Sequence, residues 1–149
     1  MRRVSMLAVL GLLSALAPCL ADEKSQAEKA AADWLYPGAK VISSGQGGAV
    51  SCVVQETADD VPTVLKHYGD KLGIELGEAG ARTGSAFSTP GGVTVEYAHV
   101  GLKPEAAGVA GTVSTFKTKA AVATLVVSRP RTAKVTTITV THVPQGAAK

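Results

Sequence analysis

The chain has 149 residues, of which 46% are hydrophobic, 18% charged and 4% aromatic. This length supports one domain, and the composition excludes a disordered protein or a collagen-like one. Because aromatic side chains are few, we expect no surface on which nucleic-acid bases stack and therefore no nucleic-acid partner.

The N-terminus has the layout of a secretory signal peptide. Arg2 and Arg3 precede an apolar run of 14 residues (4–17), and a small-residue stretch ending at Ala21 leads into polar sequence. That run is shorter than the roughly 20 residues of a membrane-spanning helix, so we expect no transmembrane span. The sequence therefore predicts cleavage after Ala21 and an extracytoplasmic protein, periplasmic or secreted.

Two other interpretations of this segment stay open. Leu16-Ala17-Pro18-Cys19 resembles a lipoprotein box, in which Cys19 carries a lipid anchor, and the Arg2-Arg3 pair resembles a twin-arginine export signal. Cleavage after Ala21 removes one of the two cysteines, so Cys52 is then alone and no intramolecular disulfide forms. A lone thiol in an oxidising compartment is most often buried.

The first half of the remaining chain predicts a helix, a hairpin and a second helix. Residues 22–35 are Ala-rich and end at a Tyr36-Pro37-Gly38 turn, and residues 39–57 read as a β-hairpin around glycines 45–48. Thr57, Asp59 or Asp60 caps the next helix, which ends at Gly73. Its apolar residues follow helical spacing on one stripe: Val61, Val64, Leu65, Tyr68 and Leu72.

The second half carries β patterns over residues 85–89, 92–100, 109–118, 120–128 and 134–143. In the last of these, threonines alternate with Ile138, Val140 and His142, so one face is wet and the other meets the helices. We expect one α+β domain over residues 22–144, with two helices on one face of an antiparallel sheet of about five or six strands, and a disordered tail over 145–149.

Part of the chain resembles a known group of proteins. Tyr36-Pro37-Gly38-Ala39, then Thr57-x-Asp59-Asp60, then Val64, Tyr68 and Leu72 form a pattern similar to that of small exported bacterial α+β proteins of largely uncharacterised function. His67-Tyr68 stands where Phe-Tyr is usual. The resemblance covers roughly residues 34–73 and implies fold and compartment, with no catalytic residue to carry over.

Motifs for known chemistry are few. The sequence has no phosphate-binding loop, no His-Glu-x-x-His motif and no nucleophile elbow, so we expect no cofactor and no metal site. A cysteine nucleophile needs a base, and Cys52 with His67, His99 or His142 is the one such combination. It defines an alternative function, a thiol-dependent or hydrolytic enzyme. Valines 50 and 54 beside Cys52 argue against it, because burial raises a thiol pKa.

All 12 acidic residues lie at or before Glu105, and the C-terminal part carries only cations. We expect one cationic patch around a basic hairpin, formed by Lys117, Lys119, Arg129, Arg131 and Lys134. Arginine forks bind carboxylates and phosphates, so an anionic envelope polymer or an acidic protein is the expected partner. The sequence thus predicts a non-enzymatic binding or accessory domain. A third possibility is a structural protein that self-associates through its sheet.

Overall fold

The computed structural model describes residues 26–77, 80–83, 87–89, 92–102 and 109–146. The expected signal peptide, with Cys19, and residues 147–149 of the expected tail lie outside these ranges. Within them, no helix is long and apolar enough to cross a membrane.

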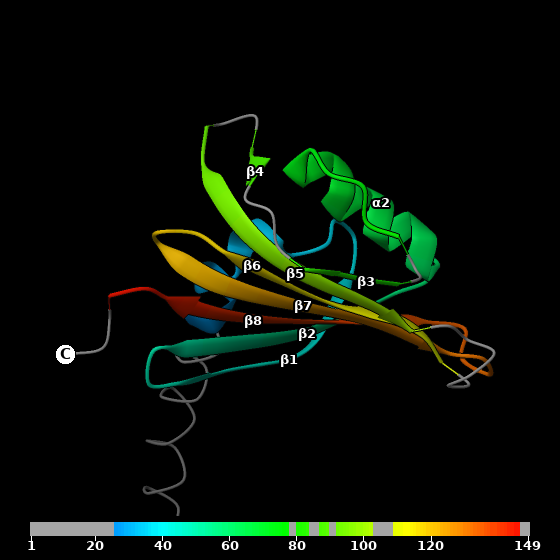
Figure 1. Cartoon of the computed structure of the whole chain (residues 1–149). Coiled ribbons are helices and arrows are strands. Elements are labelled where there is room, and N and C mark those ends of the chain that lie inside the picture. Colours follow the sequence, from blue (N-terminus) through cyan, green and yellow to red (C-terminus); the bar gives the residue numbers. More distant parts are fainter. Residues whose placement is uncertain (1–25, 78–79, 84–86, 90–91, 103–108, 147–149) are drawn as a thin grey trace, which may run out of the picture.

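An antiparallel sheet forms the centre of the fold, and helices cover one of its faces (Figure 1). Its main path has seven strands in the order β1-β2-β8-β7-β6-β5-β3, and a short β4 pairs with β5 beside it. The strands are β1 (Lys40–Gly47), β2 (Val50–Thr57), β3 (Gly80–Thr83), β4 (Phe87–Ser88), β5 (Thr94–Leu102), β6 (Val109–Lys117), β7 (Ala121–Pro130) and β8 (Thr136–Pro144).

The α+β class with an antiparallel sheet is confirmed, but the expected count of five or six strands is too low. Residues 80–83 read Gly-Ala-Arg-Thr, which has no apolar alternation to reveal a strand, yet they pair with β5 at the sheet edge. The predicted hairpin forms, and its second strand, β2, pairs with the C-terminal strand β8, so both hairpin strands join the same sheet.

Helix α2 (Val61–Leu72) begins and ends as its sequence predicts. The Asp60 carboxylate accepts a hydrogen bond from the Thr63 backbone N–H at 3.0 Å, and Pro62 occupies the first turn, where no N–H is needed. Gly73 ends the helix with a φ of +72°, a conformation that glycine adopts without strain. The helix buries its predicted stripe against the sheet: Val61, Val64, Leu65, Tyr68 and Leu72.

The segment before the sheet contains helical residues 26–30 and a 3-10 turn, η1 (Ala32–Trp34). It lies on the same face as α2, and the Trp34 ring stacks on Phe116 of β6 with centroids 5.3 Å apart. This segment therefore docks onto the sheet through Trp34, the only tryptophan of the chain.

A set of hydrogen bonds locks this segment to α2. Tyr36 donates its hydroxyl to Asp59 at 2.7 Å and its backbone N–H to the Gln55 side-chain oxygen at 2.9 Å. The Tyr68 hydroxyl donates to the Trp34 carbonyl at 2.7 Å. We call these contacts the tyrosine lock. They join Trp34 and Tyr36 to β2, to the loop before α2 and to α2 itself.

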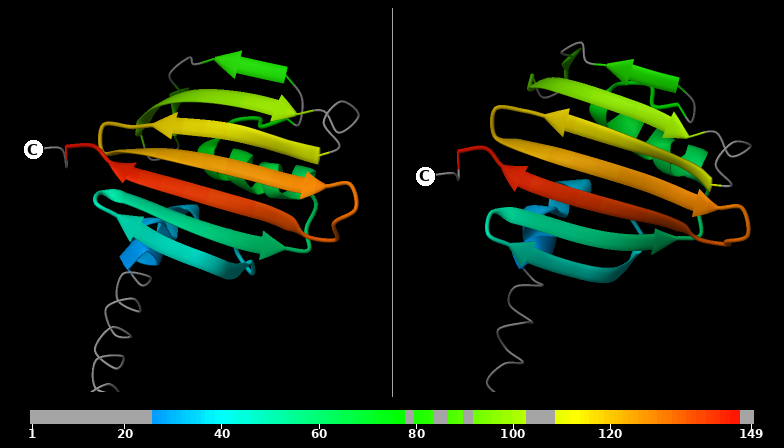
Figure 2. Two further views of the ribbon diagram at one scale, coloured as in Figure 1. Left: turned by 90° about the horizontal axis from the view of Figure 1, so that it is seen from below. Right: turned by 60° about the horizontal axis from the view of Figure 1, so that its bottom comes forward.

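The sheet has one packed and one open face, because side chains alternate along each strand. Val53, Leu125 and Ile138 are fully buried under the helices. Their neighbours in sequence point the other way, onto a face that no described helix covers; Figure 2 looks onto this side, with α2 behind the strands. We call it the open face. Thr137, Thr139 and Thr141 of β8 lie on it, as the alternation predicts, whereas Thr136 is buried on the packed face.

Replacing Tyr36 with Phe tests the tyrosine lock. Burial and the hydrogen bond to Asp59 raise the pKa of Tyr36 to about 12, above the value of about 10 of an unfolded chain. The folded state thus holds this proton more tightly, so the stabilisation is complete below pH 10 and is lost as the pH rises to about 12. We expect Tyr36→Phe to cost about 1 kcal/mol at neutral pH. It should also flatten the alkaline loss of stability. Urea unfolding at neutral pH and at several values between pH 10 and about 12 measures both effects. If the free energy of unfolding of the two proteins falls in parallel over that range, the lock is contradicted.

Gly69 gives a second test, because it is buried where α2 meets the segment after it. A Cβ added at Gly69 would lie 2.6 Å from the Ile74 carbonyl oxygen, which is backbone and has no room to move. Glycine to alanine normally stabilises a helix interior by about 1 kcal/mol. Here we expect Gly69→Ala to destabilise by about 1–3 kcal/mol, measured by thermal unfolding. A stability gain would show that residues 73–77 do not pack as described.

Candidate functional site

The structure does not bring Cys52 together with any of the three histidines. Cys52 is half-buried on the open face, opposite Thr141 of β8. Its neighbour Ser51 is buried on the packed face and pairs with His142, so Cys52 and His142 point to opposite sides of the sheet. His99 and His67 also lie on the helix side. No described histidine is therefore placed to deprotonate the thiol.

Two of the histidines have structural partners. His99 is buried, with Nε2 donating to the Gly77 carbonyl at 2.7 Å and Nδ1 2.7 Å from the Ser114 hydroxyl. His67 packs edge-on against Tyr36 and Tyr68, with ring centroids 5.1 and 5.2 Å apart. The His67 ring thus forms an aromatic cluster with these two tyrosines.

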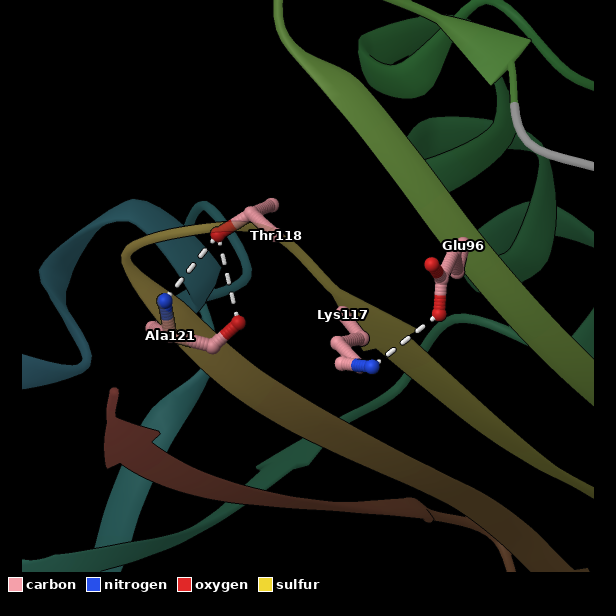
Figure 3. Close-up of polar contacts among 4 residues, drawn as sticks. All are labelled: Glu96, Lys117, Thr118 and Ala121. Atoms are coloured by element: carbon pink, nitrogen blue, oxygen red, sulfur yellow. Dashed lines mark hydrogen bonds and ion pairs between the residues drawn. The ribbon is translucent and has the colours of Figure 1, made fainter. Parts of the chain in front are cut away.

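The five expected basic residues do not form one patch. Lys117 and Lys119 lie at the turn between β6 and β7, whereas Arg129, Arg131 and Lys134 lie at the opposite end of β7. Lys117 pairs with Val122, seven residues before Arg129, so strand geometry separates the two groups by about 24 Å. Lys117 also forms an ion pair with Glu96 at 3.2 Å (Figure 3).

The Arg129 side chain supports its own turn. Its Nε donates to the Ala133 carbonyl at 3.3 Å and one terminal nitrogen donates to the Lys134 carbonyl at 3.2 Å. Its charge helps to lower the pKa of Asp60, after the hydrogen bonds from Thr63. At this end of the sheet, Arg131 and Lys134 are the exposed cations left for a partner.

An apolar pocket of about 470 Å³ lies on the packed side of the sheet, near the turn between β6 and β7. Segments distant in sequence form it: η1, the last turn of α2, the region of β4 and β5, and the strands β6 to β8. Its apolar lining consists of Trp34, Leu72, Val93, Val95, Phe116, Ala120, Ala121 and Ala123. We call it the Trp34 pocket, because the stacked Trp34 and Phe116 rings belong to its lining.

The polar groups of the Trp34 pocket are few. Asp33 and Lys71 are exposed side chains of its lining, and His142 lines it from β8. The Nδ1 atom of His142 is buried and has no hydrogen-bond partner among the described residues. A buried polar atom normally has a partner, and the other two described exceptions are side-chain atoms of Gln55 and Thr112.

The turn beside the pocket is rigidly held (Figure 3). The Thr118 hydroxyl accepts the backbone N–H of Ala121 at 3.0 Å, and the Thr118 N–H donates to the Ala121 carbonyl at 2.9 Å. Ala120 and Ala121, which line the pocket, are thereby fixed in place. Small side chains at these positions leave the space open.

A larger hollow of about 990 Å³ lies between α2 and residues 73–77. It has no aromatic side chain in its lining, and two of its charges, Lys66 and Asp70, neutralise each other at 2.6 Å. It also adjoins residues 78–79, which lie outside the described ranges. The Trp34 pocket is therefore the better candidate site. Elsewhere in the described chain, no group of three or more His, Cys, Asp or Glu side chains is placed to hold a metal ion.

The role of Arg129 can be separated from that of its neighbour. We expect Arg129→Ala to destabilise the protein by about 1 kcal/mol, because the turn loses two hydrogen bonds. Arg131 is exposed, so the same change there should stay within about 0.5 kcal/mol. Urea unfolding of both variants decides this, and equal effects would mean that the Arg129 contacts contribute nothing.

Comparisons with protein-family models, with curated proteins and with solved structures found no match to this chain. The assignment of a function therefore rests on the geometry of the pocket and of the sheet.

Proposed function

We propose that the protein is an exported, non-catalytic binding domain, and that it takes a small ligand with an apolar body into the Trp34 pocket. The observation that carries this proposal is the pocket itself, with two stacked aromatic rings and the His142 side chain in its lining. Ligand sites are typically concave, mostly apolar and furnished with a few polar groups, and the volume of about 470 Å³ lies in their usual range.

The absence of an assembled catalytic group among the described residues supports binding over catalysis. A nucleophilic cysteine needs a base within hydrogen-bond reach, and Cys52 faces away from every described histidine. Both nitrogens of His99 have partners already. The export of the protein, which the N-terminal sequence predicts, is part of the same proposal.

Docking of an anionic polymer or an acidic protein at the β7–β8 turn is the weaker candidate. Arg131 and Lys134 are exposed there and form no ion pair among the described residues. However, Arg129 shares a shallow surface hollow with Asp59 and Asp60. A polyanion would meet these carboxylates as well as the cations, and surface charges of mixed sign attract it weakly.

The proposal predicts that filling the pocket abolishes binding of an apolar probe. Anilinonaphthalene sulfonate has a flat apolar body and becomes fluorescent in such sites. We expect it to bind the wild-type protein and to quench the emission of Trp34, the only tryptophan of the chain. Ala121→Leu adds three carbons to the pocket lining and should raise the dissociation constant of the probe at least about tenfold, the equivalent of 1.4 kcal/mol.

Ala133→Leu is the matched control, because Ala133 is also half-buried but lies in the turn at the other end of β7. It should leave probe binding unchanged. If both variants bind the probe as the wild type does, the probe occupies another surface and the Trp34 pocket is not the site. If the wild type binds no probe, the proposal fails directly.

A further inference from the structure

The open face of the sheet is unusually uniform across five strands. Register pairs place its side chains in two adjoining rows, each of which crosses β2, β8, β7, β6 and β5. The first row, called the hydroxyl row, contains Cys52, Thr141, Thr124, Thr115 and Ala98. The second row, called the valine row, contains Val54, Thr139, Val126, Val113 and Val100.

These rows carry no charge and present much apolar surface. Val113 and Val100 are 40% and 47% exposed, and no described helix lies over them (Figure 2). The hydroxyls of Thr115 and Thr124 lie 3.3 Å apart and hydrogen-bond to each other, so part of the hydroxyl row is satisfied without water. Val126, Val113 and Val100 adjoin one another across three strands, and a contiguous exposed apolar patch of this kind marks an interaction site.

Charged side chains on this face lie beyond the two rows. The ion pair of Lys117 with Glu96 precedes the hydroxyl row, and Glu56 follows the valine row beside Lys40 of β1. An uncharged centre with a polar margin is the usual composition of a protein–protein interface.

The size of the open face matches what a stable dimer needs. Six strands (β1, β2, β8, β7, β6 and β5) have at least eight residues each. At about 4.8 Å per strand they span about 29 Å, and eight residues span about 27 Å, so the footprint is on the order of 800 Å². A standard interface buries about 800 Å² on each partner. The twist of two such sheets allows them to stack face to face about 10 Å apart, as in a β-sandwich.

From these observations we infer that the open face is the interface of a homodimer, in which a second copy of the chain covers the first. A two-fold axis parallel to the strands and over β7, the middle strand of the order, lays each row against the same row of the partner. Threonine hydroxyls then meet hydroxyls and valine methyl groups meet methyl groups. This inference is independent of the Trp34 pocket, which lies on the other side of the sheet.

The first test is the molar mass in solution, measured by sedimentation equilibrium on the full chain with Cys19→Ser. We expect twice the 15.1 kDa mass of one chain. Val126→Lys places a charge at the centre of the interface, twice because of the symmetry, and should weaken dimerisation at least about 100-fold. Val135→Lys is the matched control, because Val135 is exposed in the β7–β8 turn, outside both rows; it should remain dimeric.

A second test does not depend on how a lysine affects folding. The proposed axis brings Cys52 of one copy near residue 98 of the other, on β5. Within one chain, Cys52 and Ala98 lie four strand spacings apart, about 19 Å, too far for a disulfide. Ala98→Cys in the Cys19→Ser chain should therefore form covalent dimers with a short bis-maleimide, whereas the same chain with Ala98 unchanged should not.

The outcomes separate cleanly. A monomer at every soluble concentration overturns the inference. So does a dimer that keeps its mass both in the Val126→Lys variant and after complete alkylation of the Cys52 thiol. A dimer that dissociates with Val126→Lys alone and cross-links through residue 98 supports it. None of these results depends on whether the Trp34 pocket binds a ligand.

Discussion

The strict alternation of side chains along β2, β7 and β8 assigns every residue of these strands to one of two faces. Only one face is covered by the described helices, so Val53, Leu125 and Ile138 make up the core while Val54, Val126 and Thr139 stay at the surface. Because a single twelve-residue helix supplies most of that cover, its placement determines which parts of the sheet are closed and where a hollow remains.

The tyrosine lock controls that placement. Tyr68 from α2 donates to the Trp34 carbonyl, and Tyr36 donates to Asp59 just before α2 begins, so η1 and α2 are fixed relative to each other. Trp34 thereby reaches Phe116, and the pocket beside them depends on hydrogen bonds made outside it. A motif read from sequence as a turn and a helix cap is thus also a brace between two helical segments.

Local signals in the sequence were sufficient for α2, for the β1–β2 hairpin and for the packed face of β8, because capping, turn glycines and alternation each act over a few residues. The pocket could not be predicted, since Trp34, Leu72, Phe116 and His142 meet only through the tertiary fold. The basic residues show the opposite case, in which residues near in sequence do not meet in the fold. Lys117 and Arg129 are close in sequence, but a ten-residue strand separates them in space. Cys52 was expected to be buried between valines, and the alternation was right, but the face it occupies is the open one.

The pairing of β2 with β8 also affects how the chain reaches this structure. Ser51 pairs with His142, so the sheet cannot close until nearly the whole chain is available. Contacts between residues so distant in sequence are slow to form, because the loop between them must be closed first. A chain of this topology therefore has an incomplete sheet until its C-terminal strand has been made. The C-terminal strand β8 is then the final piece, because it joins the N-terminal hairpin to the rest of the sheet.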